Sequence, residues 1–268
     1  MIERRFVCRM ISCVLFAAAP AFAADPAPLV SLGIEAEPLE GDISTGRPSF
    51  STGPVPLAAG HLQLESGVQF TRIDSDTDDV TLPFALLRAG LAKNLELQVG
   101  WAGYSHTEIG GRSFKGGTDM SLALKTQLTE QSGALPAFGL LGQVSLPTGA
   151  KHKTSDSVDP SVGLLWTYDF ARAGLFGTAL LTSTTDDEDD RIFQSGMGAG
   201  VGVPLTQQLS GYVEYFGIFT EHEGPQHNAN AGLIYLLSRD LALDAVIGGG
   251  LNRHAPDYYV GVGASIRW

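Results

Sequence analysis

The sequence predicts an all-β protein, a transmembrane antiparallel up-and-down β-barrel of about 12 strands. Three observations support this prediction. Apolar and polar residues alternate with a period of two through most of the chain after residue 60, short connections alternate with longer polar ones, and the chain begins with a segment typical of exported proteins.

The N-terminal segment predicts export. A mostly basic stretch, residues 3–9, precedes an apolar run over residues 10–19, and Ala21-Phe22-Ala23 fits the small-x-small cleavage rule. The apolar run is shorter than the about 20 residues that a helical membrane span needs. We therefore expect residues 1–23 to be a signal peptide, a mature chain that begins at Ala24, and localisation in the cell outer membrane of a Gram-negative bacterium.

The composition of the mature chain excludes several kinds of site. Cys8 and Cys13 both lie in the signal peptide, which leaves no disulfide and no thiolate nucleophile or ligand. Removing three Arg and one Glu with this segment leaves 14 basic and 28 acidic residues, a net charge of about −14. Such a charge argues against nucleic acid as a partner, because phosphate binding needs a basic surface. We expect no cofactor and no metal site.

Residues 24–60 differ from the rest of the chain. They show no sustained period and are broken repeatedly by proline, at Pro26, Pro28, Pro38, Pro48, Pro54 and Pro56. We expect this stretch to be a Pro-rich periplasmic N-terminal segment, either outside the barrel or partly tucked into its mouth. Residues 61–268 are then the outer-membrane β-barrel.

The period of two is clearest in short runs of about ten residues. One of them alternates Leu95, Leu97, Val99 and Trp101 with Glu96, Gln98 and Gly100. The last run places Tyr258, Val260, Val262, Ala264, Ile266 and Trp268 on one face and Tyr259, Gly261, Gly263, Ser265 and Arg267 on the other. A chain that ends on an aromatic residue after such alternation resembles the terminal strand that the barrel insertion machinery recognises, so this machinery is an expected partner through the strand ending at Trp268.

The connections alternate in length, as in outer-membrane barrels with short periplasmic turns and longer external loops. The short ones lie at residues 92–94, 131–133, 171–172, 206–208 and 238–240. The longer ones lie at residues 73–79, 106–117, 147–159, 182–191, 220–226 and 252–257. A periplasmic β-sandwich would also alternate in polarity, but it would rarely keep long and short connections alternating throughout.

Several phrases of the chain point to one family. Among them are Gly46-Arg47-Pro48-Ser49-Phe50-Ser51-Thr52-Gly53-Pro54, Ser145-Leu146-Pro147-Thr148-Gly149, Val213-Glu214-Tyr215-Phe216-Gly217 and Ala255-Pro256-Asp257-Tyr258-Tyr259. In this order and spacing, over about residues 46–268, they resemble the bacterial transporter-like family named for the meta-pathway of phenol degradation. The resemblance implies an outer-membrane barrel associated with uptake of aromatic or other small hydrophobic compounds. It supplies no binding residues.

The alternation also predicts which polar side chains face the inside of the barrel. These lumen-lining candidates are Glu65, Glu96, Gln98, Asp119, Lys125, Gln143, Glu214, Asp244 and Arg267. They either line a selective path or form ion pairs and hydrogen bonds in a packed interior, since buried charge is tolerated only when it is paired. With acids in the majority, Lys125 and Arg267 are expected counter-ions to several carboxylates. The lumen itself is either a thin polar channel or filled by side chains and the N-terminal segment.

Other functions rest on weaker patterns. A lipase-type barrel would need a Ser and a His in contact near the outer rim, and a barrel protease would need paired acids with a His, for which His227 or Asp78-Asp79 with His222 or His106 are the nearest candidates. No nucleophile motif accompanies them, so we expect no enzyme and no catalytic residues. The Gly-rich runs at residues 196–202 and 248–250 lack the Lys of a phosphate loop and read as strand interiors. A structural or adhesion barrel is the third possibility.

The sequence thus predicts an outer-membrane β-barrel for passive uptake of small, aromatic or hydrophobic compounds. Its expected partners are a small-molecule solute and outer-membrane lipids.

Overall fold

The computed structural model describes residues 27–185 and 190–268, so the predicted signal peptide and its cleavage site lie outside the described residues. Within these ranges the chain forms one short helix and 14 strands. They are η1 (Pro28–Leu32), β1 (Leu62–Asp74), β2 (Thr77–Ala92), β3 (Leu95–Trp101), β4 (Tyr104–Ile109), β5 (Arg112–Gly117), β6 (Met120–Thr129), β7 (Ala137–Leu146), β8 (Asp159–Asp169), β9 (Gly174–Thr185), β10 (Arg191–Pro204), β11 (Leu209–Thr220), β12 (Gln226–Ser238), β13 (Leu241–Gly250) and β14 (Tyr258–Arg267). No helix in the described ranges is long and apolar enough to cross a membrane.

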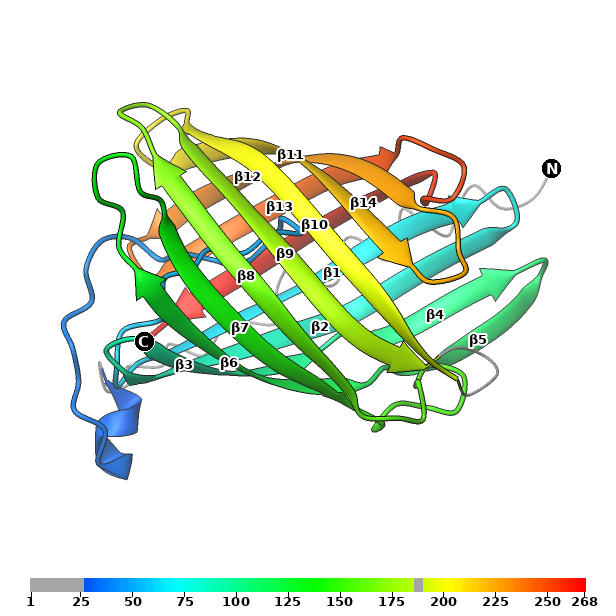
Figure 1. Ribbon diagram of the computed structural model, residues 1–268, viewed down its shortest axis with the longest axis horizontal. Coiled ribbons are helices and arrows are strands. Elements are labelled where there is room, and N and C mark those ends of the chain that lie inside the picture. The colour runs from blue at the N-terminus through cyan, green and yellow to red at the C-terminus, as the bar shows by residue number, and fades with distance from the viewer. Residues whose placement is uncertain (1–26, 186–189) are drawn as a thin grey trace.

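Twelve of the strands close into a ring, which confirms the predicted fold class (Figure 1). Neighbours along the chain pair antiparallel from β6 to β14, β3 pairs β6, and β1 pairs both β2 and β14. The last residue completes this closure: the backbone N–H of Leu62 donates to the Trp268 carbonyl at 2.9 Å, and that of Trp268 donates to the Leu62 carbonyl at 3.0 Å. No strand of the ring has an unpaired edge along its whole length, which is how barrels avoid edge-to-edge association.

The two remaining strands extend the wall at the end where the longer loops lie. β4 and β5 form a hairpin that pairs with the first part of β2, from Thr77 to Thr81, while β3 pairs with the second part, from Ala85 to Ala92. β3 and β4 therefore lie end to end along the same side of β2, with a break at residues 102–103. β5 ends the sheet order, so the wall is incomplete beside it.

This hairpin corrects the sequence prediction of a loop over residues 106–117. Residues 73–79 are likewise mostly strand, with β1 reaching Asp74 and β2 starting at Thr77, and β9 continues to Thr185. The ends of these strands near the long loops carry polar residues on both faces. Backbone pairing therefore extends beyond the region in which apolar and polar residues alternate, and the sequence pattern does not reveal it. The predicted loop at residues 147–159 is confirmed apart from Asp159, which starts β8.

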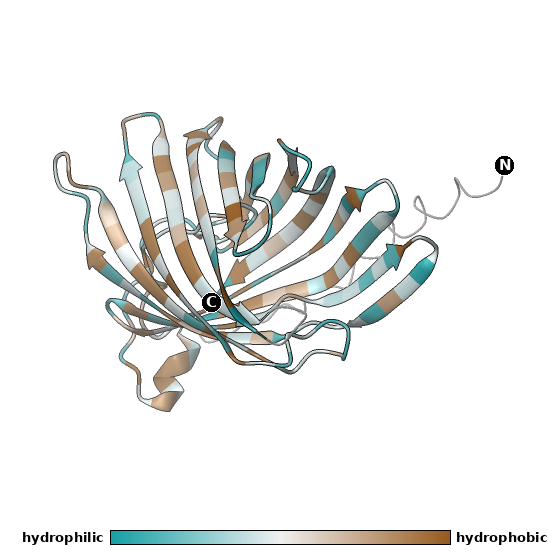
Figure 2. Ribbon diagram, turned by 45° about the vertical axis from the view of Figure 1, so that its right-hand side comes forward, coloured by the Kyte–Doolittle hydropathy of each residue, from teal (hydrophilic) through white to brown (hydrophobic). Residues whose placement is uncertain are grey.

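Hydrophobic and hydrophilic residues alternate along the strands (Figure 2), and the exposure of their side chains shows which face each one occupies. On β14, Tyr258, Val260 and Val262 are exposed on the outer face, whereas Ser265 and Arg267 are buried on the inner face. The interior is polar rather than apolar. Among the described residues, the buried apolar side chains that cluster together are Ala123, Leu141 and Leu165, whereas Glu65, Glu96 and Lys125 are at most 1% exposed. A barrel built this way needs hydrogen-bond partners in its lumen.

Candidate functional site

The lumen is occupied in part by the segment that precedes β1. η1 lies outside the barrel at the end of the short turns, near the C-terminus (Figure 1). From there the chain runs into the ring and back out before β1 begins at Leu62. We call residues 43–57 the plug. Its residues Ile43, Ser51 and Leu57 are 6%, 2% and 6% exposed, whereas Val55 is 55% exposed, so the segment is buried at separate points along its path.

The incoming part of the plug is held by two carboxylates of the wall. Glu65 on β1 accepts hydrogen bonds from the backbone N–H groups of Gly46, at 3.1 and 3.0 Å, and Arg47, at 3.2 Å. The Arg47 side chain pairs with Asp244 on β13, with Nη2 2.9 Å from Oδ1, and lies 4.0 Å above the ring of Phe84. A side chain of the plug thus neutralises a buried acid of the wall.

The turn of the plug lies against β10 and β11. Glu214 accepts the backbone N–H groups of Phe50 and Ser51, one on each carboxylate oxygen and both at 2.8 Å. The Phe50 ring stacks on Phe216 with centroids 4.6 Å apart. An extended segment has backbone N–H groups that no helix or sheet satisfies, and here a wall carboxylate satisfies two of them at once.

The outgoing part of the plug contacts a charge cluster near the short-turn end. Leu57 donates its backbone N–H to Glu96 Oε2 at 2.5 Å. Glu96 also accepts from Arg88, Nε to Oε1 at 2.8 Å, and pairs with Lys125 at 3.3 Å, while Arg88 Nη1 reaches Glu65 at 3.0 Å. Two bases and two acids thus neutralise one another in a region where all four side chains are almost fully buried.

Glycines in the wall make room for the plug. A Cβ on Gly198 would lie 2.6 Å from Ser51 Oγ, and one on Gly196 would lie 2.8 Å from the Phe50 ring. On the opposite side, a Cβ on Gly139 would lie 2.9 Å from Pro54 Cβ. Gly196 and Gly198 belong to a Gly-rich run that the sequence places in a strand interior, and the close approach of the plug adds a physical reason for it.

The remaining lumen-lining candidates have different surroundings. Gln98 donates to Glu96 at 2.6 Å, and Gln143 is half-buried. Asp119 holds the loop between β7 and β8, residues 147–158, by accepting the backbone N–H groups of Gly149 at 2.8 Å and Ser155 at 3.2 Å. Arg267 pairs with Asp240 in the turn before β13. The expectation that Arg267 is a counter-ion to the lumen carboxylates is therefore wrong.

Two bases that were not among the predicted lumen residues, Arg88 and Arg47, neutralise most of the lumen carboxylates. Arg88 bridges Glu65 and Glu96, and Arg47 binds Asp244. Lys125 pairs directly with Glu96, at 3.3 Å, and also interacts electrostatically with Glu65, as we expected of a counter-ion to several carboxylates. Arg88 lies in a predominantly apolar stretch of β2, and Arg47 lies in a segment with no period, so neither stood out by alternation.

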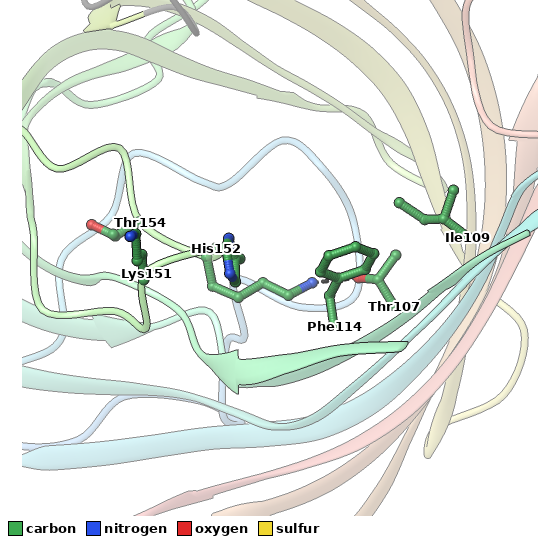
Figure 3. A pocket seen from close by; sticks show the side chains of 7 residues that line it. Thr107, Ile109, Phe114, Lys151, His152 and Thr154 are labelled. Atoms are coloured by element: carbon green, nitrogen blue, oxygen red, sulfur yellow. Dashed lines mark hydrogen bonds between the residues drawn. The ribbon is translucent and has the colours of Figure 1, made fainter. Parts of the chain in front are cut away.

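The other half of the lumen, toward the long loops, is lined by hydroxyls and amides together with ion pairs such as Arg191–Asp159, at 2.8 Å. Ser161 and Thr182 hydrogen-bond at 2.9 Å, and Gln194 donates to Thr220 at 2.9 Å. Near the rim a hollow of about 630 Å³ lies between the β4–β5 hairpin and the loop of residues 147–158 (Figure 3). This half therefore has both polar walls and open space.

The candidate catalytic histidines do not form a relay with an acid and a nucleophile. His106 Nε2 lies 2.8 Å from Ser113 Oγ and 3.5 Å from Glu108, so both partners contact the same nitrogen. His227 Nδ1 lies 2.6 Å from the Tyr215 hydroxyl. Asp79 binds Ser105, Thr107 and Lys153. Among the described residues, no group of three or more His, Cys, Asp or Glu is placed to hold a metal ion.

The sequence of residues 45–268 matches the family described as "Putative MetA-pathway of phenol degradation". The chain belongs to this family. The match begins within the plug and ends at the last residue of the chain, so the family pattern includes both the plug and the closing strand. A comparison with curated proteins finds no match.

Solved structures share the fold. An outer membrane channel from Pseudomonas putida F1 is 11% identical, with 87% of this chain and 100% of that chain covered and a TM-score of 0.61. The NanC porin is 10% identical, with 76% and 98% covered and a TM-score of 0.49. The KdgM porin is 8% identical, with 76% and 98% covered and a TM-score of 0.49. At 11% identity, the likeness to the Pseudomonas putida channel shows a shared β-barrel fold.

Proposed function

We propose that this chain is an outer-membrane channel that lets small, weakly polar solutes, aromatic compounds among them, diffuse passively across the membrane. The family name and the description of the Pseudomonas putida protein as a channel support this proposal. In it, the short-turn end faces the periplasm, residues 1–23 are removed as a signal peptide, and the strand ending at Trp268 is read by the insertion machinery.

One observation carries the proposal. The lumen holds a single peptide segment, which the wall binds through its backbone N–H groups, through Arg47 and through the stacking of Phe50 on Phe216. Hydrogen bonds to charged groups contribute about 1.5 to 3 kcal/mol each, and water that enters the lumen can replace them. A plug so held is suited to partial displacement, whereas interdigitated apolar side chains would close the barrel permanently.

The lumen-lining candidates have a definite role in this proposal. Glu65, Glu96 and Glu214 hold the plug, and Arg88, Lys125 and Arg47 neutralise part of the charge that the wall acids would otherwise present to a solute. Glu214 accepts only from N–H groups and has no basic partner among the described residues, so the path beside the plug keeps some negative charge. Hydroxyls and amides along the outer half would replace the water around a weakly polar solute.

A disulfide between plug and wall tests the proposal. Ser51 Oγ lies 2.6 Å from where a Cβ on Gly198 would be, so cysteines at Ser51 and Gly198 fall within the reach of a disulfide. The expected mature chain has no other cysteine. In planar bilayers and in vesicles loaded with phenol, we expect the reduced S51C/G198C variant to pass ions and solute and the oxidised form to pass far less.

The single variants S51C and G198C are the matched controls and should not respond to oxidant; G198C also shows how far the new side chain itself shifts the plug. If S51C/G198C conducts equally well oxidised and reduced, the plug does not govern passage. If the wild-type barrel and the reduced variant are both folded and neither conducts ions nor releases phenol, the channel function is wrong.

A further inference from the structure

The hollow near the rim combines positive charge with an apolar surface. Its lining residues are Thr107, Ile109, Phe114, Lys151, His152, Lys153 and Thr154 (Figure 3). Two of these are Lys, one is His, and none is acidic. On a mature chain whose expected net charge is about −14, a basic hollow in the mouth of the barrel stands apart from its surroundings.

The loop that supplies the basic residues is fixed on both sides of them. Asp119 accepts the backbone N–H groups of Gly149 and Ser155, and Ala150 N–H donates to the Gly117 carbonyl at 2.8 Å. Gly116 makes this approach possible, because a Cβ there would lie 2.4 Å from the Ala150 Cβ. A site held in this way loses little conformational entropy when a ligand binds.

The two lysines of the hollow have different tasks. Lys153 Nζ donates to Ser105 Oγ at 2.7 Å and to Thr107 Oγ1, and lies 3.7 Å from Asp79, so its charge is balanced and it fastens the loop to the hairpin. Lys151 is exposed and has no ion pair among the described residues. Its ammonium is therefore the positive charge available to an anion.

The opposite wall of the hollow is apolar. Phe114 and Ile109 both belong to the β4–β5 hairpin, and the Phe114 ring meets the edge of the His152 ring at 5.9 Å and 78°. Phe114 and Lys151 both line the hollow (Figure 3), so a ligand with a flat apolar group and an anion meets an apolar and a cationic side chain in the same space. The space is ample, since a cavity of about 150 Å³ already accommodates benzene.

We propose that this hollow is a binding site for small aryl carboxylates, which it captures at the mouth of the barrel. The ring of the ligand lies against Phe114 and its carboxylate pairs with Lys151. A neutral phenol would gain only the apolar contact, and a small aliphatic acid only the ion pair. The role of the site in uptake rests on the proposed channel function, whereas binding itself does not.

Binding to the purified, folded barrel tests this site. Isothermal titration with benzoate, benzyl alcohol and acetate at low salt should show the tightest binding for benzoate. Replacing the charge with K151Q should weaken benzoate binding by about two- to fivefold, as expected for a partly exposed ion pair, and leave benzyl alcohol unchanged. Added salt should weaken benzoate binding to the wild-type protein and have little effect on K151Q.

The matched control is K115Q, because Lys115 is an exposed lysine of the same hairpin that does not line the hollow. F114L should weaken benzoate and benzyl alcohol alike. The proposal is overturned if benzoate binds no more tightly than benzyl alcohol, or if K115Q weakens benzoate as much as K151Q does. A barrel that conducts ions but does not bind benzoate would contradict this binding site and not the channel function. A barrel that binds benzoate but does not conduct would contradict the channel function and not the binding site.

Discussion

Arg88 donates two parallel hydrogen bonds to Glu96, Nε to Oε1 at 2.8 Å and Nη2 to Oε2 at 2.9 Å, on the inner face of the barrel wall. This bidentate pair joins β2 to β3, and the third nitrogen of Arg88 reaches Glu65 on β1. Three consecutive strands are thereby linked at the level where the plug leaves the lumen. The geometry is the strongest that a guanidinium and a carboxylate can form.

Removing Glu96 should destabilise the barrel strongly. Glu96→Ala leaves Lys125 without its ion pair and Arg88 with only Glu65, and breaking a buried pair in this way costs about 3–5 kcal/mol. Lys125→Met should cost less, because Glu96 keeps Arg88 and the Leu57 N–H. The free energy of unfolding in urea, measured in lipid vesicles, gives both values.

The control for this comparison is Glu108→Ala on the β4–β5 hairpin, where the side chain is 61% exposed. We expect a change within about 0.5 kcal/mol there. Equal losses for Glu96→Ala and Glu108→Ala would contradict a structural role of the cluster.

The plug should loosen when one of its anchors is weakened. Glu214→Gln keeps the size of the side chain but replaces one acceptor oxygen by an amide that donates, so the N–H groups of Phe50 and Ser51 can no longer both be satisfied. We expect faster hydrogen exchange at these two amides, with strand amides unchanged. Mass spectrometry of peptides that cover residues 43–57 measures this.

A matched substitution lies outside the plug. Glu221→Gln changes a carboxylate that accepts the Phe193 N–H at 2.8 Å near the rim, and it should leave exchange of the plug amides as in the wild type. Unchanged exchange at Phe50 and Ser51 in Glu214→Gln would show that the carboxylate does not hold the plug.

Much of the fold could be predicted because a barrel wall has one simple rule. Each residue of β14 faces either outward or inward, so the alternation around Val262 and Arg267 could be read without knowing any partner strand. The rule fails where both faces are polar. Ser105 and Thr107 face the loop of residues 147–158, and the outer face of β4 carries Tyr104, His106 and Glu108, so the hairpin resembles a polar loop in sequence.

The partners of the buried charges could not be predicted in the same way. Arg88 meets Glu65 and Glu96 because of the registers of β1, β2 and β3, and a pattern along one strand contains no information about register between strands. The plug has no period at all, so the pairing of Arg47 with Asp244, 197 residues away, depends on the path of the segment through the lumen. The alternation predicts which acidic residues face the lumen, but it does not predict the residues that they bind.

The two faces of the wall should respond differently to the same new charge. Val262 is 53% exposed on the outer face near the middle of β14, and Gln69 is half-buried on the inner face of the neighbouring β1, opposite Gly261. In a membrane-spanning barrel, Val262→Arg places a guanidinium against lipid, which costs about 2–4 kcal/mol near the bilayer midplane. Gln69→Arg places the same group in a polar lumen with water and hydroxyls, including that of Thr71, so we expect a loss below about 1 kcal/mol. Refolding titrations into vesicles of a single lipid measure both. Equal losses at the two positions would contradict a lipid-facing outer surface, and a larger loss at Gln69 would mean that the lumen is packed more tightly than its polar lining indicates.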